Sequence, residues 1–346
     1  MKFTLIVPLA PERNAEILEA IKNLDYNKNK FHVVVPIGKN PSLNRNRGID
    51  KAKGDFVVFL DDDAIIENNY LNKVEKFLEN HPEIDMVGGP QLTFYDDKGF
   101  ARISGYALSS KFGAWKLSNR YSTNKESLDV DETALTSANL ICKKKVVEKV
   151  RFDEKLFPGE DPKFVADVKK QGFKIAYSPE IIVYHKRRPN FSSFVKQIFN
   201  YGKARPEKES FFETLKKPFF LIPSSFLVYF VLLIGSILVN PSITGNVVNF
   251  NSLINNLNSD DIGSSADRRG FAGYAIYSGE NVSINLAFLW FLPLIAYILL
   301  IILFSFYDSI KNKDIKAIFV LPFIYPTIHL SYGAGMIWGW MRRVFW

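Results

Sequence analysis

Three long apolar segments with almost no charge lie in the C-terminal part of this 346-residue chain. They cover residues 218–240, 284–307 and 317–340, and each has the roughly 20 residues that a helix needs to cross a bilayer. No stretch before residue 190 comes close to that length. The apolar run at 3–10 is short and cut by proline, so it reads as a first strand and not as a signal peptide. The chain is therefore expected to place a soluble domain first and a membrane domain last.

The distribution of basic residues predicts the orientation of that membrane domain. Residues 186–217, just before the first apolar segment, hold nine Lys or Arg against three Glu, and the 308–316 link is again rich in Lys. The 241–283 connection has two Arg against four acidic residues. The positive-inside rule then places the soluble domain in the cytosol and 241–283 outside, in a multi-pass cell-membrane protein. Pro322 and Pro326 leave open whether the last segment crosses fully or is kinked or re-entrant.

The net charge of +8 does not indicate nucleic acid as a partner. The basic residues cluster beside the membrane, where anionic lipid head groups attract each of them by about 1 kcal/mol. No basic patch interleaved with aromatic residues is found elsewhere. The single cysteine, Cys142, excludes an internal disulfide framework and a Cys-rich metal site.

Short apolar runs alternate with amphipathic segments through the first 190 residues, which predicts a doubly wound α/β sheet. The region from about 91 to 140 reads as irregular. Strands are expected at 3–7, 31–35, 56–60, 85–88, 174–177 and 181–184, and helices at 15–23, 42–52, 70–79 and 162–171.

Three consecutive aspartates, Asp61, Asp62 and Asp63, end the apolar run at 56–60. Ligands of parallel α/β sheets bind just beyond the carboxyl ends of the strands. Side chains alternate along an extended chain, so Asp61 and Asp63 should face one way and Asp62 the other. Two hard carboxylates side by side suit a divalent cation that also holds phosphate oxygens. The alternative is a solvated turn or the beginning of a helix.

An ordered series of short motifs spans residues 1–205. It comprises Val7-Pro8, Arg45-Asn46-Arg47-Gly48-Ile49, Ala52-Lys53-Gly54-Asp55, Phe59-Leu60-Asp61-Asp62-Asp63, Gly88-Gly89-Pro90, Phe152-Asp153-Glu154, Gly159-Glu160-Asp161 and Val183-Tyr184-His185-Lys186-Arg187. The series resembles family 2 of the inverting glycosyltransferases, which have the GT-A nucleotide-sugar fold. The branch that it resembles most contains membrane-attached, succinoglycan-type transferases of surface polysaccharides and lipid-linked glycans. Dolichyl-phosphate mannose synthases are more distant cousins.

The resemblance implies a donor site around the aspartates. Asp63 would be the direct ligand of Mn²⁺ or Mg²⁺, with Asp61 nearer the ribose or the metal. His185 would be a third ligand, although a surface histidine beside basic residues is the alternative. The positions that match donor-binding residues are Pro8, Arg45, Asp61, Asp62, Gly89 and Arg187. Arg45 could equally pair with a surface carboxylate.

On the acceptor side, the resemblance makes Asp161 the catalytic base and gives Glu160 a supporting role in acceptor binding. A carboxylate within hydrogen-bond reach is the usual general base for an attacking hydroxyl. The preceding Phe157-Pro158-Gly159 turn would lift the pair into the cleft. The structural alternative is that Asp161 caps a helix with Pro162 at its first position.

Two departures from the family pattern limit what it implies. Val35 is followed by Pro36 and Ile37, where many relatives carry an aspartate motif that reads the base. Base recognition is therefore unassigned, and the donor, a UDP- or GDP-sugar by the resemblance, stays open between the two nucleotides. Processive synthases carry Gln-x-x-Arg-Trp on an interface helix, whereas this chain keeps only Gln197. The second departure favours addition of one sugar.

Residues 191–217 carry a largely helical apolar face with basic flanks, typical of a helix lying in the membrane interface. Gln197, Tyr201 and Arg205 would lie there, on the acceptor side. The alternative is a linker helix packed on the domain. His329 in the last apolar segment is an unusual polar group at membrane depth.

These observations predict a GT-A catalytic domain at 1–190, amphipathic interface helices at 191–217 and a transmembrane domain at 218–346. The expected enzyme is a hexosyltransferase that moves one sugar from a nucleotide sugar to a polyprenyl- or dolichyl-linked acceptor at the cytosolic membrane face. A polyprenyl-phosphate sugar synthase is the first alternative. A catalytically silent GT-A scaffold is the second.

Overall fold

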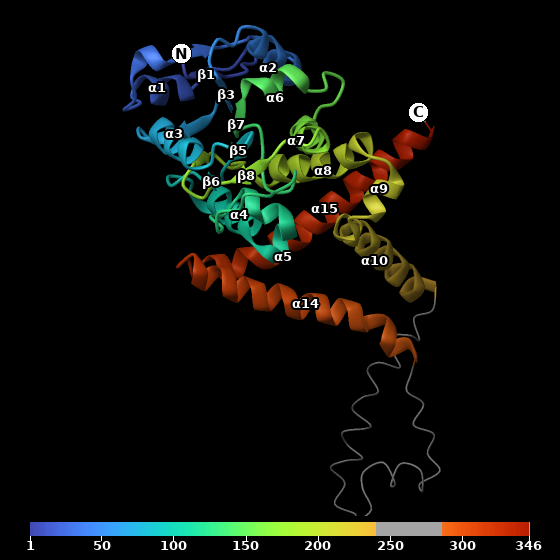
Figure 1. The fold of residues 1–346 in the computed structure, drawn as a ribbon. Helices are drawn as coiled ribbons and strands as arrows, with labels where there is room; N and C mark the ends of the chain where they lie inside the picture. The colour runs from blue at the N-terminus through green and yellow to red at the C-terminus, as the bar shows by residue number, and fades with distance from the viewer. Residues whose placement is uncertain (240–285, 346) are drawn as a thin grey trace, which may run out of the picture. The chain divides into compact units, whose positions relative to one another are not determined.

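The computed structural model describes residues 1–239 and 286–345 (Figure 1). It divides into two compact units, Met1–Ser225 with Phe304–Trp346, and Phe226–Leu303. The expected external connection at 241–283 lies outside the described residues.

A six-stranded sheet forms the centre of the larger unit, in the order β2-β1-β3-β7-β5-β8. The strands are β1 Phe3–Ile6, β2 Phe31–Val34, β3 Phe56–Leu60, β5 Met86–Gly88, β7 Asn139–Lys143 and β8 Ile175–Tyr177. β1 pairs in parallel with β2 and β3, and β5 pairs in parallel with β8. β7 is antiparallel to both of its neighbours, so the sheet is mixed.

Helices cover both faces of this sheet (Figure 1). They are α1 Ile17–Lys22, α2 Pro41–Asp50, α3 Tyr70–Asn80, α6 Lys144–Lys149 and α7 Glu160–Lys170. Val58 and Leu60 of β3 pack with residues of α1 and α3, whereas Val57 and Phe59 pack with residues of α2, α6 and α7. Side chains alternate along β3, so its apolar run is buried on both faces. The doubly wound α/β fold expected from the sequence is confirmed.

A second, three-stranded sheet has the order β4-β9-β6, formed by β4 Ala64–Ile66, β9 Val183–His185 and β6 Gln91–Thr93. β4 and β9 are antiparallel, and Ala64 lies opposite His185. This pairing joins the aspartate triplet to a segment more than 100 residues away in the sequence. The sequence analysis predicted β9 but neither β4 nor β6.

The expectation of irregular structure at 91–140 was wrong. This region contains β6, α4 Gly99–Ser109, α5 Lys111–Ala114 and the 3₁₀ helix η2 Trp115–Arg120, and it ends at β7. Gly105 and the two serines, Ser104 and Ser109, lower the helical propensity of α4, so its sequence did not predict a helix. A Cβ at Gly105 would lie 2.1 Å from Thr93 Oγ1, so glycine is required for α4 to approach β6.

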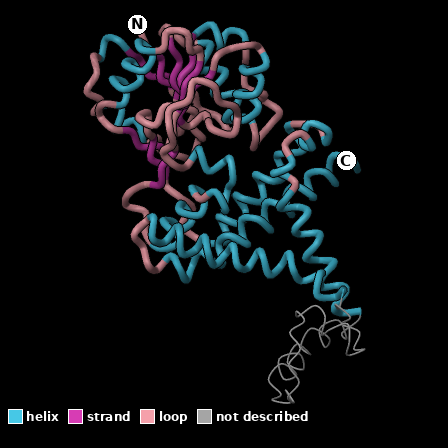
Figure 2. Tube along the Cα trace, turned by 60° about the horizontal axis from the view of Figure 1, so that its bottom comes forward, coloured by secondary structure: helices cyan, strands magenta, loops and turns pink. Residues whose placement is uncertain are grey.

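The C-terminal part of the described chain is helical (Figure 2). It contains α8 Phe191–Lys208, α9 Phe211–Leu215, η3 Pro218–Phe220, α10 Ile222–Val239, α14 Leu286–Lys311 and α15 Ala317–Phe345; the short η1 Lys28–Lys30 belongs to the first half. In the described residues, three helices are long and apolar enough to cross a membrane: Ile222–Val239, Leu289–Lys311 and Ala317–Phe345. α15 continues through Pro322 and Pro326, so neither proline breaks the helix.

Helices α8 and α15 lie side by side (Figure 1). Glycines let their backbones touch. A Cβ at Gly202 of α8 would lie 2.1 Å from Tyr332 O, and one at Gly335 of α15 would lie 2.0 Å from Phe199 O. His329 Nε2, on the same helix, donates to Phe112 O of α5 at 2.9 Å. These contacts attach α15 to the rest of the larger unit.

The smaller unit takes its described residues from α10 and α14. Within it, Tyr229 Oη donates to Trp290 O at 2.6 Å, and the rings of Phe226 and Tyr297 lie 4.2 Å apart.

Candidate active site

Asp61, Asp63 and His185 form a cluster at the carboxyl end of β3. One ligand atom from each lies within 4.8 Å of the others. Asp61 and Asp63 follow the buried strand directly, and His185 enters from β9 through its pairing with β4. Asp62 instead reaches a 3.0 Å ion pair with Arg13 and is almost fully buried.

The donor atoms of this cluster fit a divalent cation. Carboxylate oxygens suit Mg²⁺ and Mn²⁺, and a neutral imidazole suits Mn²⁺, which is a transition-metal ion. His185 Nδ1 lies 3.0 Å from the carbonyl oxygen of Lys186, so Nδ1 carries a proton and donates it there. Nε2 lies 3.0 Å from Asp63 Oδ1; burial lowers the pKa of His185, but that carboxylate outweighs burial and raises the pKa. In the neutral ring, Nε2 would be the nitrogen that offers its lone pair to a cation. Fixing the tautomer through the second ring nitrogen is usual for histidine ligands.

Arg45, on α2, joins this cluster to a second acidic pair. Its Nη2 donates to Asp61 Oδ1 at 3.1 Å and its Nη1 to Glu160 Oε1 at 3.0 Å. Nη1 also lies 3.8 Å from Asp161 Oδ1. The guanidinium is buried, and its carbon lies 5.3 Å from the centre of the Phe152 ring. The residue therefore pairs with carboxylates, but these are the buried Glu160 and the half-buried Asp61, not the surface partner considered from the sequence.

Glu160 and Asp161 occupy the first turn of α7. Gly159 precedes them with a φ of 112°, a left-handed conformation that glycine adopts without strain. The helix begins at Glu160, and its Ncap residue is Gly159, so the alternative of Asp161 as an N-cap was wrong. Glu160 points to Arg45 and is buried, whereas the Asp161 side chain is 27% exposed. Ser137 Oγ donates a hydrogen bond to Asp161 Oδ1.

The environments of these carboxyl groups differ. Burial, together with the neighbouring Asp161 carboxylate, raises the pKa of Glu160 to about 7, although Arg45 opposes the shift. Burial also raises the pKa of Asp62 to about 6. Burial would raise the pKa of Asp63 too, but His185 and Arg13 outweigh it and lower that pKa. Asp63 is thus held as a carboxylate, the form that binds a cation.

Two residues of this site escaped the sequence analysis. Arg13, in the loop after β1, contacts Asp63 at 2.7 Å as well as Asp62. Ser137 precedes β7 and contacts Asp161. Both lie in loops without periodicity, so neither had a signal beyond its residue type.

Other predicted donor residues are engaged elsewhere. Arg187 donates to Gln91 O and Thr93 Oγ1, and its guanidinium carbon lies 4.9 Å from the centre of the Tyr121 ring. Gly89 is a packing position, because a Cβ there would lie 2.0 Å from Ile181 O. Pro8 is buried just beyond β1.

The three residues predicted on the acceptor side all lie on α8. Gln197 Nε2 donates to Tyr201 Oη at 3.1 Å on the exposed side of the helix. Arg205 is buried, with its guanidinium 2.8 Å from Glu209 and 3.3 Å from the centre of the Phe220 ring. No contact given by the structure joins any of the three to the aspartates in the described part of the chain.

The chain is similar to several glycosyltransferases. It is 24% identical over 168 residues to a dolichyl N-acetyl-α-D-glucosaminyl phosphate 3-β-D-2,3-diacetamido-2,3-dideoxy-β-D-glucuronosyltransferase of Methanococcus voltae, which covers 46% of this chain and 49% of that one. It is 26% identical over 198 residues to an uncharacterized glycosyltransferase of Methanocaldococcus jannaschii, covering 57% and 64%. The O-antigen chain rhamnosyltransferase WbaN of Salmonella anatum is 28% identical over 178 residues, covering 50% and 55%.

Among solved structures, the mannosyltransferase PcManGT of Pyrobaculum calidifontis, in complex with GDP-Man and Mn²⁺, matches 59% of this chain and 61% of its own, with a TM-score of 0.43 and 15% identity. S. aureus TarS 1–349 matches 57% and 64%, with a TM-score of 0.41 and 18% identity. The model of the family described as "Glycosyltransferase like family 2" matches residues 5–200. This chain belongs to that family.

Proposed function

We propose that this chain is an inverting, metal-dependent glycosyltransferase that moves one sugar from a nucleotide-diphosphate sugar to a lipid-linked acceptor. One observation carries the proposal: Arg45 connects a cluster suited to a cation with a pair of carboxylates suited to proton transfer. Transfer needs both functions side by side. A domain that served only as a scaffold would not need them.

On the donor side, Asp61, Asp63 and His185 would hold Mn²⁺ or Mg²⁺. Such an ion supplies Lewis-acid stabilisation of the negative charge on the departing diphosphate. Arg45 keeps Asp61 in place through its 3.1 Å hydrogen bond, which preorganises that carboxylate before the donor arrives. Arg13 pairs with Asp63 and would have to share that carboxylate with the cation.

On the acceptor side, Asp161 would accept the proton of the attacking hydroxyl. Of the pair at the beginning of α7 it is the more exposed, so a substrate can reach it. Ser137 holds one of its oxygens, which fixes the orientation of the carboxylate. Glu160 is buried against Arg45 and would position that guanidinium.

The acceptor would be a polyprenyl- or dolichyl-linked molecule presented at the cytosolic face of the membrane. The three apolar helices and the basic residues before α10 support this location. The name of the Methanococcus voltae relative, which includes a dolichyl-linked acceptor, supports the acceptor class. In this proposal residues 1–190 are catalytic, 191–217 lie at the interface and 218–346 form the membrane domain.

A test separates donor binding from turnover. Full-length protein in detergent is titrated with a panel of UDP- and GDP-sugars, with and without Mn²⁺. Asp63→Asn should lose metal-dependent donor binding, whereas Asp161→Asn should keep that binding and lose turnover. Asp167→Asn is the matched control, because Asp167 lies on the same helix as Asp161 and pairs with Lys163. Normal turnover by Asp161→Asn would rule out its role as the base.

The nature of the product distinguishes the first alternative. With a lipid phosphate as the only acceptor, a polyprenyl-phosphate sugar synthase forms a glycosyl phosphate, whereas the proposed enzyme forms a glycosidic bond to an already glycosylated lipid. NMR of the product would show which bond forms and whether the anomeric configuration is inverted.

A further inference from the structure

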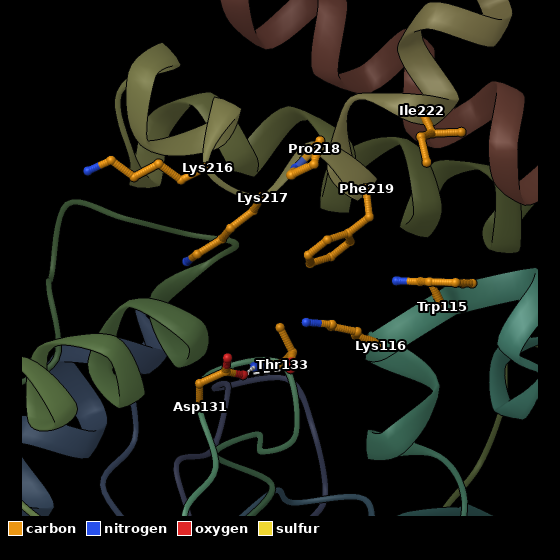
Figure 3. Close-up of a pocket in the computed structure, with 9 residues that line it drawn as sticks. All are labelled: Trp115, Lys116, Asp131, Thr133, Lys216, Lys217, Pro218, Phe219 and Ile222. Atoms are coloured by element: carbon orange, nitrogen blue, oxygen red, sulfur yellow. Dashed lines mark hydrogen bonds between the residues drawn. The ribbon is translucent and has the colours of Figure 1, made fainter.

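A cavity of about 410 Å³ lies where η2 approaches the segment between α9 and α10 (Figure 3). Trp115 and Phe219 give it aromatic walls, Lys116, Lys216 and Lys217 give it ammonium groups, and Ile222 closes it at the first residue of α10. None of the proposed active-site residues lines it. The cavity is therefore separate from the proposed active site.

The ammonium groups of the cavity differ in how they are neutralised. Lys216 forms a 2.6 Å ion pair with Glu213, and Lys217 pairs with Glu132. The Lys116 ammonium instead lies over the ring of Phe219, 5.5 Å from the ring centre. In the described part of the chain Lys116 has no ion pair with a carboxylate.

The carboxylate that lines the cavity does not neutralise Lys116. Asp131 Oδ1 accepts hydrogen bonds from the backbone nitrogen of Thr133 at 2.8 Å and from Thr133 Oγ1 at 2.6 Å (Figure 3). These bonds hold the Asp131 carboxylate against the loop that carries Thr133. An anion that enters the cavity can therefore be met by the Lys116 ammonium.

Exposed apolar side chains lie on the wall of this cavity and on α9, the helix just before its lysines. Phe212 of α9 is 76% exposed, and Phe211, Leu215 and Trp115 are also exposed. Ile222 begins a helix that is apolar enough to cross a membrane. Exposed aromatic side chains beside lysines are typical of the membrane–water interface, where one end of a ligand is charged and the other apolar. A small soluble anion would make no use of this apolar surface.

We propose that this cavity binds the head group of an anionic membrane phospholipid. The phosphate would lie against the Lys116 ammonium, between Trp115 and Phe219, and the acyl chains would run past Ile222 along the outside of the apolar surface. The bound lipid would tie η2 to the segment that leads into α10. This role is independent of the glycosyl transfer proposed above.

Native mass spectrometry of the full-length protein in a neutral detergent tests the proposal. The probes are phosphatidylglycerol and phosphatidylcholine of matched chains. The wild-type protein should retain phosphatidylglycerol in preference to phosphatidylcholine. Lys116→Gln should lose about fivefold of that preference, the effect of one basic residue near an anionic lipid, and Lys116→Glu should lose more. Equal retention in Lys116→Glu and the wild type would overturn the proposal.

Two controls keep the outcome specific. Lys76→Glu makes the same charge change at an exposed lysine of α3 and should leave lipid retention unchanged. Inorganic phosphate and a polyprenyl phosphate are then added as competitors to protein loaded with phosphatidylglycerol. Neither should displace the phospholipid at matched concentration. Displacement by inorganic phosphate would show that no lipid is required, and selective displacement by polyprenyl phosphate would assign the cavity to an acceptor; either result would contradict the proposal.

Discussion

Arg45 and Glu160 are 115 residues apart in the sequence and form a buried ion pair, with Nη1 donating to Oε1 at 3.0 Å. Their side chains are only 5% and 7% exposed. Through its other nitrogen, Arg45 also holds Asp61. A single guanidinium thus couples the end of β3 to the beginning of α7, and the two halves of the proposed site depend on it.

Arg45→Gln should destabilise the protein and abolish donor binding. Removing one partner of a buried ion pair leaves uncompensated charge in the interior, at a cost of about 3–5 kcal/mol. Arg45→Lys keeps the charge but cannot bridge two carboxylates with a planar fork, so it should restore only part of the stability. Thermal unfolding in detergent measures the stability and a nucleotide-sugar titration measures the binding.

Arg47→Gln is the matched control for this experiment. Arg47 lies two residues further along α2 with an exposed side chain, so its replacement should change stability by no more than about 0.5 kcal/mol. If Arg45→Gln unfolded no more readily than Arg47→Gln, the buried guanidinium would not be the connection between the two acidic groups.

Glu160 should make the protein less stable as the pH rises. Its pKa is raised from 4.5 to about 7 in the folded state, so the folded protein holds a proton that the unfolded chain has already lost. The contribution of Glu160 to the free energy of unfolding is therefore fully present below about pH 4.5. It is lost progressively up to about pH 7, by at most about 1.4 kcal/mol per pH unit. Thermal unfolding temperatures across this range measure the effect.

Glu160→Gln removes the titrating group while keeping its shape. The variant should show a flatter dependence of unfolding temperature on pH than the wild type between about pH 5 and pH 7. A slope equal to that of the wild type would mean that another carboxyl group carries the dependence. Glu154→Gln, which removes a carboxyl that contacts Asn46 outside this pair, serves as the comparison.

The sequence predicted β1, β2 and β3 from their short apolar runs, but not β7, which pairs with β3 in the centre of the sheet. It predicted the turn at Phe157-Pro158-Gly159 because of its proline and glycine. It also singled out the aspartates and the carboxylates of α7. It could not predict that β4 and β9 pair, since that contact is set by the tertiary fold. The same holds for the partners of Arg45, which no local pattern can reveal.

The helical content of 91–140 was missed for a different reason. The glycine and serines of α4 are poor helix formers. Tertiary packing stabilises the helix in spite of them, as the close approach of Gly105 to Thr93 shows. The helix α8 was predicted from its apolar face, but its packing against α15 was not. The small residues of α15 form no sequence pattern that predicts their packing against α8.

Arg13→Gln should strengthen cation binding at the aspartate cluster. Arg13 contacts both Asp62 and Asp63, and its positive charge opposes a second cation at Asp63. Because the side chain is half exposed, solvent screens the effect, and we expect a gain of up to about fivefold in Mn²⁺ affinity. Calorimetric titration of the donor-free protein measures it. The control is Arg151→Gln, whose pair with Asp50 is also exposed, and an unchanged affinity in Arg13→Gln would show that Arg13 does not compete with the ion.

The glycine contacts between α8 and α15 should be sensitive to a single methyl group. Gly202→Ala and Gly335→Ala would each place a Cβ about 2 Å from a backbone oxygen of the other helix, which flexible side chains cannot relieve. The two helices must separate, so we expect a loss of about 1–3 kcal/mol, as for overpacked cores.

Gly235→Ala on α10 is the matched control. A Cβ at Gly235 meets nothing within 4 Å among the described residues, so the change should be neutral or stabilise the helix by up to about 1 kcal/mol through propensity alone. Thermal unfolding of the three variants in one detergent separates the effects of contact and propensity. If the unfolding temperatures of Gly202→Ala and Gly335→Ala rose as that of Gly235→Ala does, helix propensity would dominate. The close approach of α8 to α15 would then not be needed for stability.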